Sequence, residues 1–320
     1  MAKSIHHACI GRGISAIKAK DENSQEFLYQ WFFSFESEWK NISQGGTFDA
    51  VNSDDIKNLR VPIPQPQEQQ KIASCLSSLD ELIAAHNDKL DALKDHKKGL
   101  LQNLFPQEGE TVPKVRFPEF EEDGEWVKKP VRKVFSIFQG YAFSSKDSVP
   151  MGIRWLKIAD VGIQRMKADT PSYLPISYKD EHSKFLLKKG DFVMALTRPI
   201  LNMELKIAQI DDQYHNSLLN QRVGKLVTQN DKVFVYYLLQ TKEMVESINA
   251  NIAGNDPPNL SFKQISDIEI LIPKSKKEQK KIASCLSALD ELISSQTNKI
   301  EHLQQHKKGL MQGLFPKMTD

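Results

Sequence analysis

Residues 68–106, EQQKIASCLSSLDELIAAHNDKLDALKDHKKGLLQNLFP, return almost unchanged at residues 278–316 as EQKKIASCLSALDELISSQTNKIEHLQQHKKGLMQGLFP. The two stretches align without gaps at an offset of 210 residues and share 25 identities over 39 positions. Most of the sequence between them is of a different kind. The chain is therefore predicted to hold two copies of one long element separated by a domain, and a solenoid of short repeats is excluded.

Each copy carries an apolar stripe whose members recur alternately every four and three positions, which is the spacing of a coiled-coil helix. The helix-pairing residues on this stripe are Ile72, Leu76, Leu79, Ile83, Leu90 and Leu93 in the first copy, and Ile282, Leu286, Leu289, Ile293, Ile300 and Leu303 in the second. Neither run contains an internal proline, and each is followed by one, at Pro106 and Pro316. At about 1.5 Å per residue such a helix is roughly 55 Å long, which exceeds the needs of a small core. We therefore predict that the two helices pair with each other.

Polar residues interrupt the stripe at matching positions of the two copies. We expect His86 opposite Gln296, and Lys97 opposite Lys307, to help fix the register of the helices at some expense of stability. The alternative is that these are two ordinary amphipathic helices in separate domains. The near identity of their surfaces favours a shared role.

The sequence between the helices predicts a mixed α/β domain. It contains strand-like runs such as RWLKIADV and GDFVMAL, a helical stretch at 232–250 and glycine turn signals. Segments 60–69 and 270–279 both predict a final strand that turns into the helix. The apolar and aromatic residues Trp155, Ile158, Val161, Trp31, Phe32, Tyr236 and Tyr237 are predicted to be core.

The first domain is predicted to be incomplete. FLYQWFF at 27–33 resembles FVYYLLQ at 234–240, so the residues before the first helix match only the tail of the middle domain. The predicted organisation is the C-terminal part of a first domain at 1–64, a long helix at 65–107, a linker and domain start at 108–124, a complete second domain at 125–274 and a second long helix at 275–317.

Composition and motifs limit where the protein is expected to work and which catalytic or metal sites it can contain. The chain has no run of about 18 apolar residues and no secretory signal, and its three cysteines lack ligand or disulfide spacing, so we expect a cytoplasmic protein with no membrane partner and no metal. The formal charge of +2 does not by itself announce a nucleic-acid binder. Phosphate-loop, zincin and serine hydrolase motifs are missing from the sequence, so no catalytic residue is predicted.

Three strings carry a resemblance to a known family. They are PIPQPQEQQKIASCLSSLDELI at 62–83, HKKGLLQNLFP at 96–106 and PKVRFPEFEEDGEW at 113–126. They resemble the central conserved region of the specificity subunits of type I restriction-modification enzymes, where the last string opens the second target-recognition domain. The resemblance implies α/β target-recognition domains joined by two long antiparallel coiled-coil helices.

The resemblance also implies a non-catalytic subunit with several partners. These are double-stranded DNA, of which each recognition domain reads one half of a split site, two DNA adenine methyltransferase subunits, and a restriction and translocase subunit. It implies no cofactor on this chain, with S-adenosylmethionine, ATP and magnesium bound by the partner subunits. An alternative stays open, in which a truncated half-subunit binds methyltransferase, or associates with itself through its helices, without reading a full bipartite site.

Base recognition requires Arg, Lys, Asn or Gln at groove edges, with other basic and hydroxyl groups on phosphates. The candidates between the helices are Gln139, Tyr141, Ser144, Lys146, Arg154, Lys157, Arg165, Lys167, Arg198, Asn202, Lys206, Asn220, Gln221 and Arg222. Arg198 is the strongest of them, because it follows the strand-like run FVMAL and lies in a loop with a proline and an asparagine.

One motif favours an enzyme at first sight. Asn255–Pro258 reads NDPP, similar to the loop of adenine methyltransferases, in which an aromatic residue follows the prolines. Here the next residue is Asn259, which has no ring to stack on a flipped base, and no glycine-rich cofactor motif precedes it. We therefore predict a structural loop between a helix and a strand.

Overall fold

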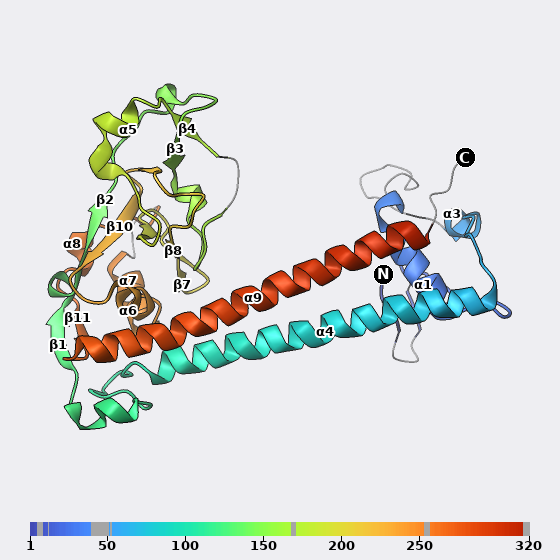
Figure 1. Ribbon diagram of the computed structural model, residues 1–320, viewed down its shortest axis with the longest axis horizontal. Helices are drawn as coiled ribbons and strands as arrows, with labels where there is room; N and C mark the ends of the chain where they lie inside the picture. Colours follow the sequence, from blue (N-terminus) through green and yellow to red (C-terminus); the bar gives the residue numbers. More distant parts are fainter. Residues whose placement is uncertain are drawn as a thin grey trace. The chain divides into compact units, whose positions relative to one another are not determined.

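The computed structural model describes residues 1–4, 9–11, 13–39, 51, 53–167, 171–252 and 257–315. It divides into two compact units, residues 1–94 with 291–320 and residues 95–290. Two long helices, α4 (Pro66–Asn103) and α9 (Lys276–Leu314), supply residues to both units (Figure 1). Among the helices of these ranges, none has both the length and the apolar content needed to cross a membrane.

The apolar stripe explains why α4 and α9 form. All twelve of the predicted helix-pairing residues are buried or half-buried, and Leu76 and Leu286 are completely buried. Pro66 opens α4, where its missing N–H would have had no intrahelical acceptor. The prediction of two long helices is confirmed.

In the first unit, the helix α1 (Gln25–Ser34) packs against the long helices. Ser24 caps it by accepting a hydrogen bond from the backbone N–H of Phe27, whose ring lies 5.6 Å from that of Phe315. The remaining described elements of this unit are the 3-10 helix η1 (Glu36–Glu38) and the short helix α3 (Ser53–Lys57). The core of the unit comprises Phe27, Trp31, Phe32, Ile72, Ala73, Leu76, Met311 and Phe315.

The two helices run antiparallel within this unit. Gln296 Nε2 lies 2.7 Å from the carbonyl oxygen of His86 and 2.8 Å from its ring nitrogen Nδ1. Lys307 Nζ lies 2.6 Å from Asp80 Oδ1. From Asp80 to His86 the residue number increases along α4, while their partners Lys307 and Gln296 decrease in number along α9, so the two helices are antiparallel. The expected pairing of His86 with Gln296 is present.

The expected pairing of Lys97 with Lys307 is wrong. Lys307 binds Asp80 in the first unit, and in the second unit Lys97 Nζ lies 2.6 Å from Asp290 Oδ1. Two buried ammonium groups would repel each other, so each takes a carboxylate instead. Asp80 and Asp290 occupy the same position of the repeat, so one ion pair is built twice.

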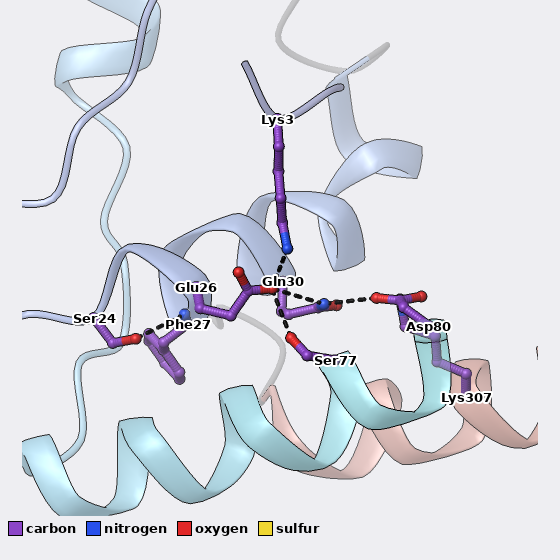
Figure 2. A network of polar contacts seen from close by, with 8 residues as sticks. All are labelled: Lys3, Ser24, Glu26, Phe27, Gln30, Ser77, Asp80 and Lys307. Atoms are coloured by element: carbon purple, nitrogen blue, oxygen red, sulfur yellow. Dashed lines mark hydrogen bonds and ion pairs between the residues drawn. The ribbon is translucent and has the colours of Figure 1, made fainter. Parts of the chain in front are cut away.

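Figure 2 shows how Asp80 connects α1, α4 and α9 in the first unit. Its Oδ2 accepts a hydrogen bond of 2.8 Å from Gln30 Nε2, while its Oδ1 faces Lys307. Beside it, Glu26 accepts from Ser77 at 2.7 Å and from Lys3 at 2.7 Å. A single carboxylate therefore supplies the acceptors for two buried side chains, Gln30 and Lys307.

We expect Asp80→Ala to lower the free energy of unfolding of the first unit by about 1–3 kcal/mol, because it leaves the buried Lys307 ammonium without its carboxylate and removes the shorter hydrogen bond of the buried Gln30 amide. The matched control is Asp91→Ala. Asp91 contacts Lys94 at 3.6 Å on the exposed surface of α4, and its removal should change stability by at most about 0.5 kcal/mol. Urea unfolding of both variants measures this difference, and equal effects would contradict the prediction.

The second unit is a mixed α/β domain. Its main sheet has the order β2-β10-β5-β8, and a smaller sheet has the order β4-β3-β9; all pairs are antiparallel except β3 with β9. The strands are β1 (Val127–Pro130), β2 (Phe135–Gln139), β3 (Ile153–Leu156), β4 (Tyr173–Leu174), β5 (Phe192–Ala195), β6 (Ile200–Leu201), β7 (Glu204–Leu205), β8 (Ile207–Gln209), β9 (Leu218–Leu219), β10 (Val223–Thr228) and β11 (Glu269–Ile272). The α-helices of this domain are α5 (Tyr178–Glu181), α6 (Lys232–Leu238), α7 (Lys242–Ile252) and α8 (Phe262–Ile265).

Two apolar clusters form the core of this domain. One joins the end of α4 and the start of α9 to α6, α7 and the main sheet, and Figure 1 shows α6 and α7 beside the first turns of α9. The other joins the main sheet to the smaller one and contains Trp155 and Val161. The predicted core aromatics Trp31, Phe32, Tyr236 and Tyr237 are buried, which confirms that part of the prediction.

The helical stretch predicted at 232–250 is two helices. The Thr241 hydroxyl donates to the carbonyl oxygen of Leu238, at the end of α6, and accepts from the backbone N–H of Met244 in α7. A side chain that satisfies both ends in this way favours a break in the helix.

Only one of the two strands predicted before the long helices is present. β11 forms before α9 because β1 pairs with it, with Val127 opposite Ile272. Residues 60–65 form no strand, since no strand among the described residues pairs with them. The repeated sequence therefore has a strand only where a second strand is available.

A buried ion pair fixes the segment between α4 and β1 onto α9. Arg116 forms two parallel hydrogen bonds with Glu278, Nε to Oε1 at 2.8 Å and Nη2 to Oε2 at 2.9 Å. Trp126 Nε1 donates to the same carboxylate at 3.1 Å, and Arg116 Nη1 donates to the carbonyl oxygen of Gly124. The hydrogen bonds to the Glu278 carboxylate raise the pKa of the Arg116 guanidinium, so the guanidinium stays charged.

Candidate nucleic-acid interface

Three polar segments converge at one edge of the main sheet. β2 ends at Gln139 and β5 ends at Ala195, while β10 lies between them and starts at Val223. Gln139 is opposite Gly224, and Ala195 is opposite Val223. Because β10 runs antiparallel to both neighbours, its start meets their ends, and the loops 139–144, 196–199 and 220–222 lie close together.

Gly140 allows two of these loops to touch. A Cβ atom at this position would lie 2.2 Å from the carbonyl oxygen of Asn220 and 2.3 Å from that of Leu219, closer than any side chain can approach backbone. The backbone N–H of Tyr141 donates to the Leu219 carbonyl at 2.9 Å, and Gln221 N–H donates to the Tyr141 carbonyl at 2.9 Å. The missing side chain therefore positions Tyr141 and Gln221 next to each other.

A polar hollow opens at this edge. It has a volume of about 530 Å³. Gln139 Nε2 donates to the Gln221 carbonyl at 2.8 Å on one side, and on the other Thr197 Oγ1 donates to Asn259 Oδ1 at 2.7 Å. Its polar lining comprises Gln139, Thr197, Gln221, Arg222, Asn259, Ser261 and Gln264. Amide, hydroxyl and guanidinium groups of this kind recognise the edges of bases.

A basic cluster of Lys167, Arg198 and Lys206 lies beside the hollow. Burial lowers the pKa of the Lys206 ammonium, and the positive charges of Lys167 and Arg198 lower it further. Within the described part of the chain, none of the three forms an ion pair with a carboxylate. Among the residues that the structure describes, the cluster therefore has no neutralising anion, and a phosphate group of a nucleic acid would supply one.

Arg198 connects the basic cluster to the hollow. Its backbone has a φ of 47°, in the left-handed region, and its N–H donates to the carbonyl oxygen of Pro258 at 2.7 Å. Pro258 belongs to the NDPP motif, of which Asn255 and Asp256 lie outside the described residues. The described half of the motif thus contacts the loop after β5 and leaves the Arg198 side chain exposed.

Several candidates have local structural partners. The Arg154 guanidinium lies 3.8 Å from the ring centroid of Tyr214, and Lys157 Nζ lies 4.3 Å from that of Trp155. The Ser144 hydroxyl caps a 3-10 turn by accepting from Lys146 N–H at 3.2 Å. These contacts give each of these side chains a structural role that does not require DNA.

The other candidates fall into two groups. Asn220 is buried and its Oδ1 accepts from the backbone N–H of Arg222 at 3.1 Å, which shapes the loop. Lys146, Arg165 and Asn202 are exposed, the last at the tip of the hairpin β6–β7. The fourteen candidates therefore do not form one surface, and the sheet edge with its basic cluster accounts for Gln139, Tyr141, Lys167, Arg198, Lys206, Gln221 and Arg222.

Sequence reasoning missed two polar or aromatic residues at this edge, His182 and Asn259. The ring of His182 lies 4.5 Å from that of Tyr141, which is 43% exposed, and Thr197 bonds to Asn259 across the hollow. His182 and Asn259 come from segments 41 and 118 residues away from Tyr141 in sequence, and no local pattern indicates their approach.

No metal centre accompanies this edge in the ranges that the structure describes, where no three His, Cys, Asp or Glu side chains gather in ligand geometry.

Comparison with known proteins gives a consistent result. The model of the family described as "Type I restriction modification DNA specificity domain" matches residues 5–95 and 123–305. The chain is 31% identical over 282 residues to the type I restriction enzyme MjaVIII specificity subunit of Methanocaldococcus jannaschii, covering 86% of this chain and 66% of the relative. It is 27% identical over 262 residues to the EcoAI specificity subunit of Escherichia coli, covering 81% of this chain and 41% of the relative. The chain thus spans two thirds or less of the length of these relatives.

Solved structures show the same fold. The S subunit of a type I restriction-modification system from M. genitalium superposes with a TM-score of 0.59 at 18% identity, covering 93% of this chain and 74% of that one. A chain from a study of complex assembly and conformational transition of the type I R-M system superposes with a TM-score of 0.54 at 15% identity, covering 92% and 71%. The prediction of α/β domains with two long antiparallel helices is confirmed.

Proposed function

We propose that this chain, which belongs to the type I restriction modification DNA specificity family, reads one half of a bipartite DNA site with residues 125–274 and holds DNA adenine methyltransferase subunits. It performs no chemistry of its own. The single observation that carries the DNA-reading role is the sheet edge where three polar loops meet beside three cations, Lys167, Arg198 and Lys206, that form no ion pair with any of the described carboxylates.

The two parts of this edge suit the two parts of DNA recognition. The basic cluster provides charge for phosphates, which positions a protein on the duplex, while Gln139, Gln221 and Arg222 offer the hydrogen-bonding groups that distinguish bases. One domain therefore contains both the phosphate-binding charge and the base-recognising groups that reading a half-site requires.

The partners follow from the same proposal. The repeated helices α4 and α9 present nearly the same surface twice, which suits two copies of one methyltransferase subunit. S-adenosylmethionine is bound by that subunit, and ATP and magnesium by a restriction and translocase subunit, while this chain binds no cofactor. The complex works in the cytoplasm.

The proposal is tested by co-expressing the chain with its methyltransferase and sequencing the methylated genome with long reads. The expected result is a stable complex and methylated adenine in a motif that is absent without the chain. A bipartite motif of two different halves supports reading by two domains, whereas a palindrome supports self-association of two copies through their helices. If the methyltransferase neither co-elutes with the chain nor changes its methylation pattern, the proposal is wrong.

A further inference from the structure

The hairpin β6–β7 projects an apolar tip beside the basic cluster. Ile200 and Leu205 form its inward face and pack into or against the core, while the cross-strand pair Leu201 and Glu204 faces outward. Leu201 and Met203 are each 52% exposed. The tip therefore offers two large apolar side chains to a partner.

The turn of this hairpin has a strained backbone conformation. Asn202 and Met203 have φ values of 52° and 59°, and a two-residue hairpin loop with both φ values positive is a type I′ turn. Asn followed by Gly is the favoured pair for such a turn, because a side chain at the second position strains the backbone. Met203 occupies a position where glycine would be more stable. Its thioether side chain is exposed. A local rule broken in this way, with no packing gained, is typical of a functional position.

The positive charges beside the hairpin indicate what kind of partner its tip contacts. Arg198 lies two residues before the hairpin and Lys206 directly after it, and Lys167 lies close enough to Lys206 to lower its pKa. Positive charge at the base and apolar residues at the tip complement duplex DNA, in which phosphates flank grooves lined by base edges and thymine methyl groups. Glu204, opposite Leu201, is the one carboxylate of the hairpin; it would be repelled by a phosphate but can accept a hydrogen bond from a cytosine amino group.

We infer that the hairpin Ile200–Leu205 enters a DNA groove and contacts base edges through Leu201 and Met203, while the cations at its base hold the flanking phosphates. This inference rests on the proposed function, since it names the element that reads sequence within the proposed half-site reader. The tip contributes to sequence discrimination, and the cations contribute to affinity for any duplex.

The test uses the full chain in complex with its methyltransferase, and two DNA duplexes, one with the motif found by methylome sequencing and one scrambled. Met203→Gly and the double variant Leu201→Ser/Met203→Gly are compared with the unmodified chain by fluorescence anisotropy at fixed salt. We expect Met203→Gly to keep or raise the thermal midpoint of unfolding, because it relieves the turn. We expect the double variant to lose about tenfold in affinity for the motif, and to bind the scrambled duplex as before.

Met151→Gly is the matched control, because Met151 is 87% exposed on the same unit and is remote in sequence from the hairpin. Its affinity for both duplexes should not change. Unchanged discrimination by the hairpin variants would overturn the inference, as would an equal loss in Met151→Gly. Loss of methyltransferase co-elution instead of DNA affinity would show that the tip binds protein and would also overturn it. Failure of the unmodified complex to prefer the motif would contradict the proposed function itself.

Discussion

Replacing Arg116 with alanine is expected to lower the free energy of unfolding of the second unit by about 3–5 kcal/mol, the largest effect on stability that the structure predicts. Glu278 is 1% exposed, and its carboxylate accepts two hydrogen bonds from Arg116 and one from Trp126. Without the guanidinium, the carboxylate stays buried with a single indole donor. An uncompensated buried charge of this kind is far more unfavourable than the loss of an exposed pair.

Urea unfolding followed by tryptophan fluorescence measures this effect, since Trp126 reports directly from the pair. Lys281→Ala is the control. Lys281 contacts Glu119 at 3.0 Å, with both side chains about half exposed, and its loss should change stability by less than about 1 kcal/mol. The double variant Arg116→Met/Glu278→Leu should recover most of the loss, because it removes both charges together. If Arg116→Ala unfolds with the same midpoint as Lys281→Ala, the buried pair does not hold this segment.

Removing the basic cluster is expected to have the largest effect on DNA binding. The triple variant Lys167→Gln/Arg198→Gln/Lys206→Met should bind the methylated motif about a hundredfold more weakly near 0.15 M salt. Each of the three phosphate contacts strengthens binding by a similar factor through counterion release, and together these three factors multiply to the expected loss. The slope of log affinity against log salt concentration should fall by about 3. Affinity for a scrambled duplex should fall by the same factor, since phosphates carry no sequence.

Titration of the complex with duplex DNA at four salt concentrations gives both quantities. The matched control is Lys128→Gln/Lys129→Gln/Lys133→Gln, which removes the same net charge from exposed positions at and after β1. An unchanged slope in the first triple variant, or an equal change in the control, would show that the cluster does not contact phosphate.

The sequence predicts the helices well because their signal is local and repeated. The stripe from Ile72 to Leu93 specifies a buried face wherever the helix lies, and its copy from Ile282 to Leu303 repeats it. Partner choice is less visible. Lys97 and Lys307 occupy equivalent positions, which suggested pairing, but antiparallel packing brings each to an aspartate of the other helix.

Identical residues can also acquire different environments. Glu68 and Glu278 are the same position of the repeat, yet Glu68 is exposed while Glu278 is buried by Arg116 and Trp126. The difference comes from a segment that is not part of the repeat. A pattern within one helix therefore cannot indicate it.

The candidate interface was predictable only in part. Basic and amide residues in loops indicate groups able to bind DNA, and seven of the fourteen candidates do lie at the sheet edge or in its basic cluster. Arg154 and Lys157 instead lie over the rings of Tyr214 and Trp155, because a cation over the face of an aromatic ring is stabilised there in any case. Which loops meet depends on strand order, and the order β2-β10-β5-β8 is set by contacts distant in sequence.

The ladder of β1 with β11 has a consequence for engineering. Val127 opposite Ile272 brings the entry and the exit of the α/β domain side by side, as in domains that tolerate insertion into a host chain. The domain between them is thus a cassette that can be exchanged at two adjacent junctions. A chimera that joins foreign sequence inside this ladder, and keeps Arg116, Trp126 and Glu278 from the host, would change what is read without disturbing what holds the reader in place.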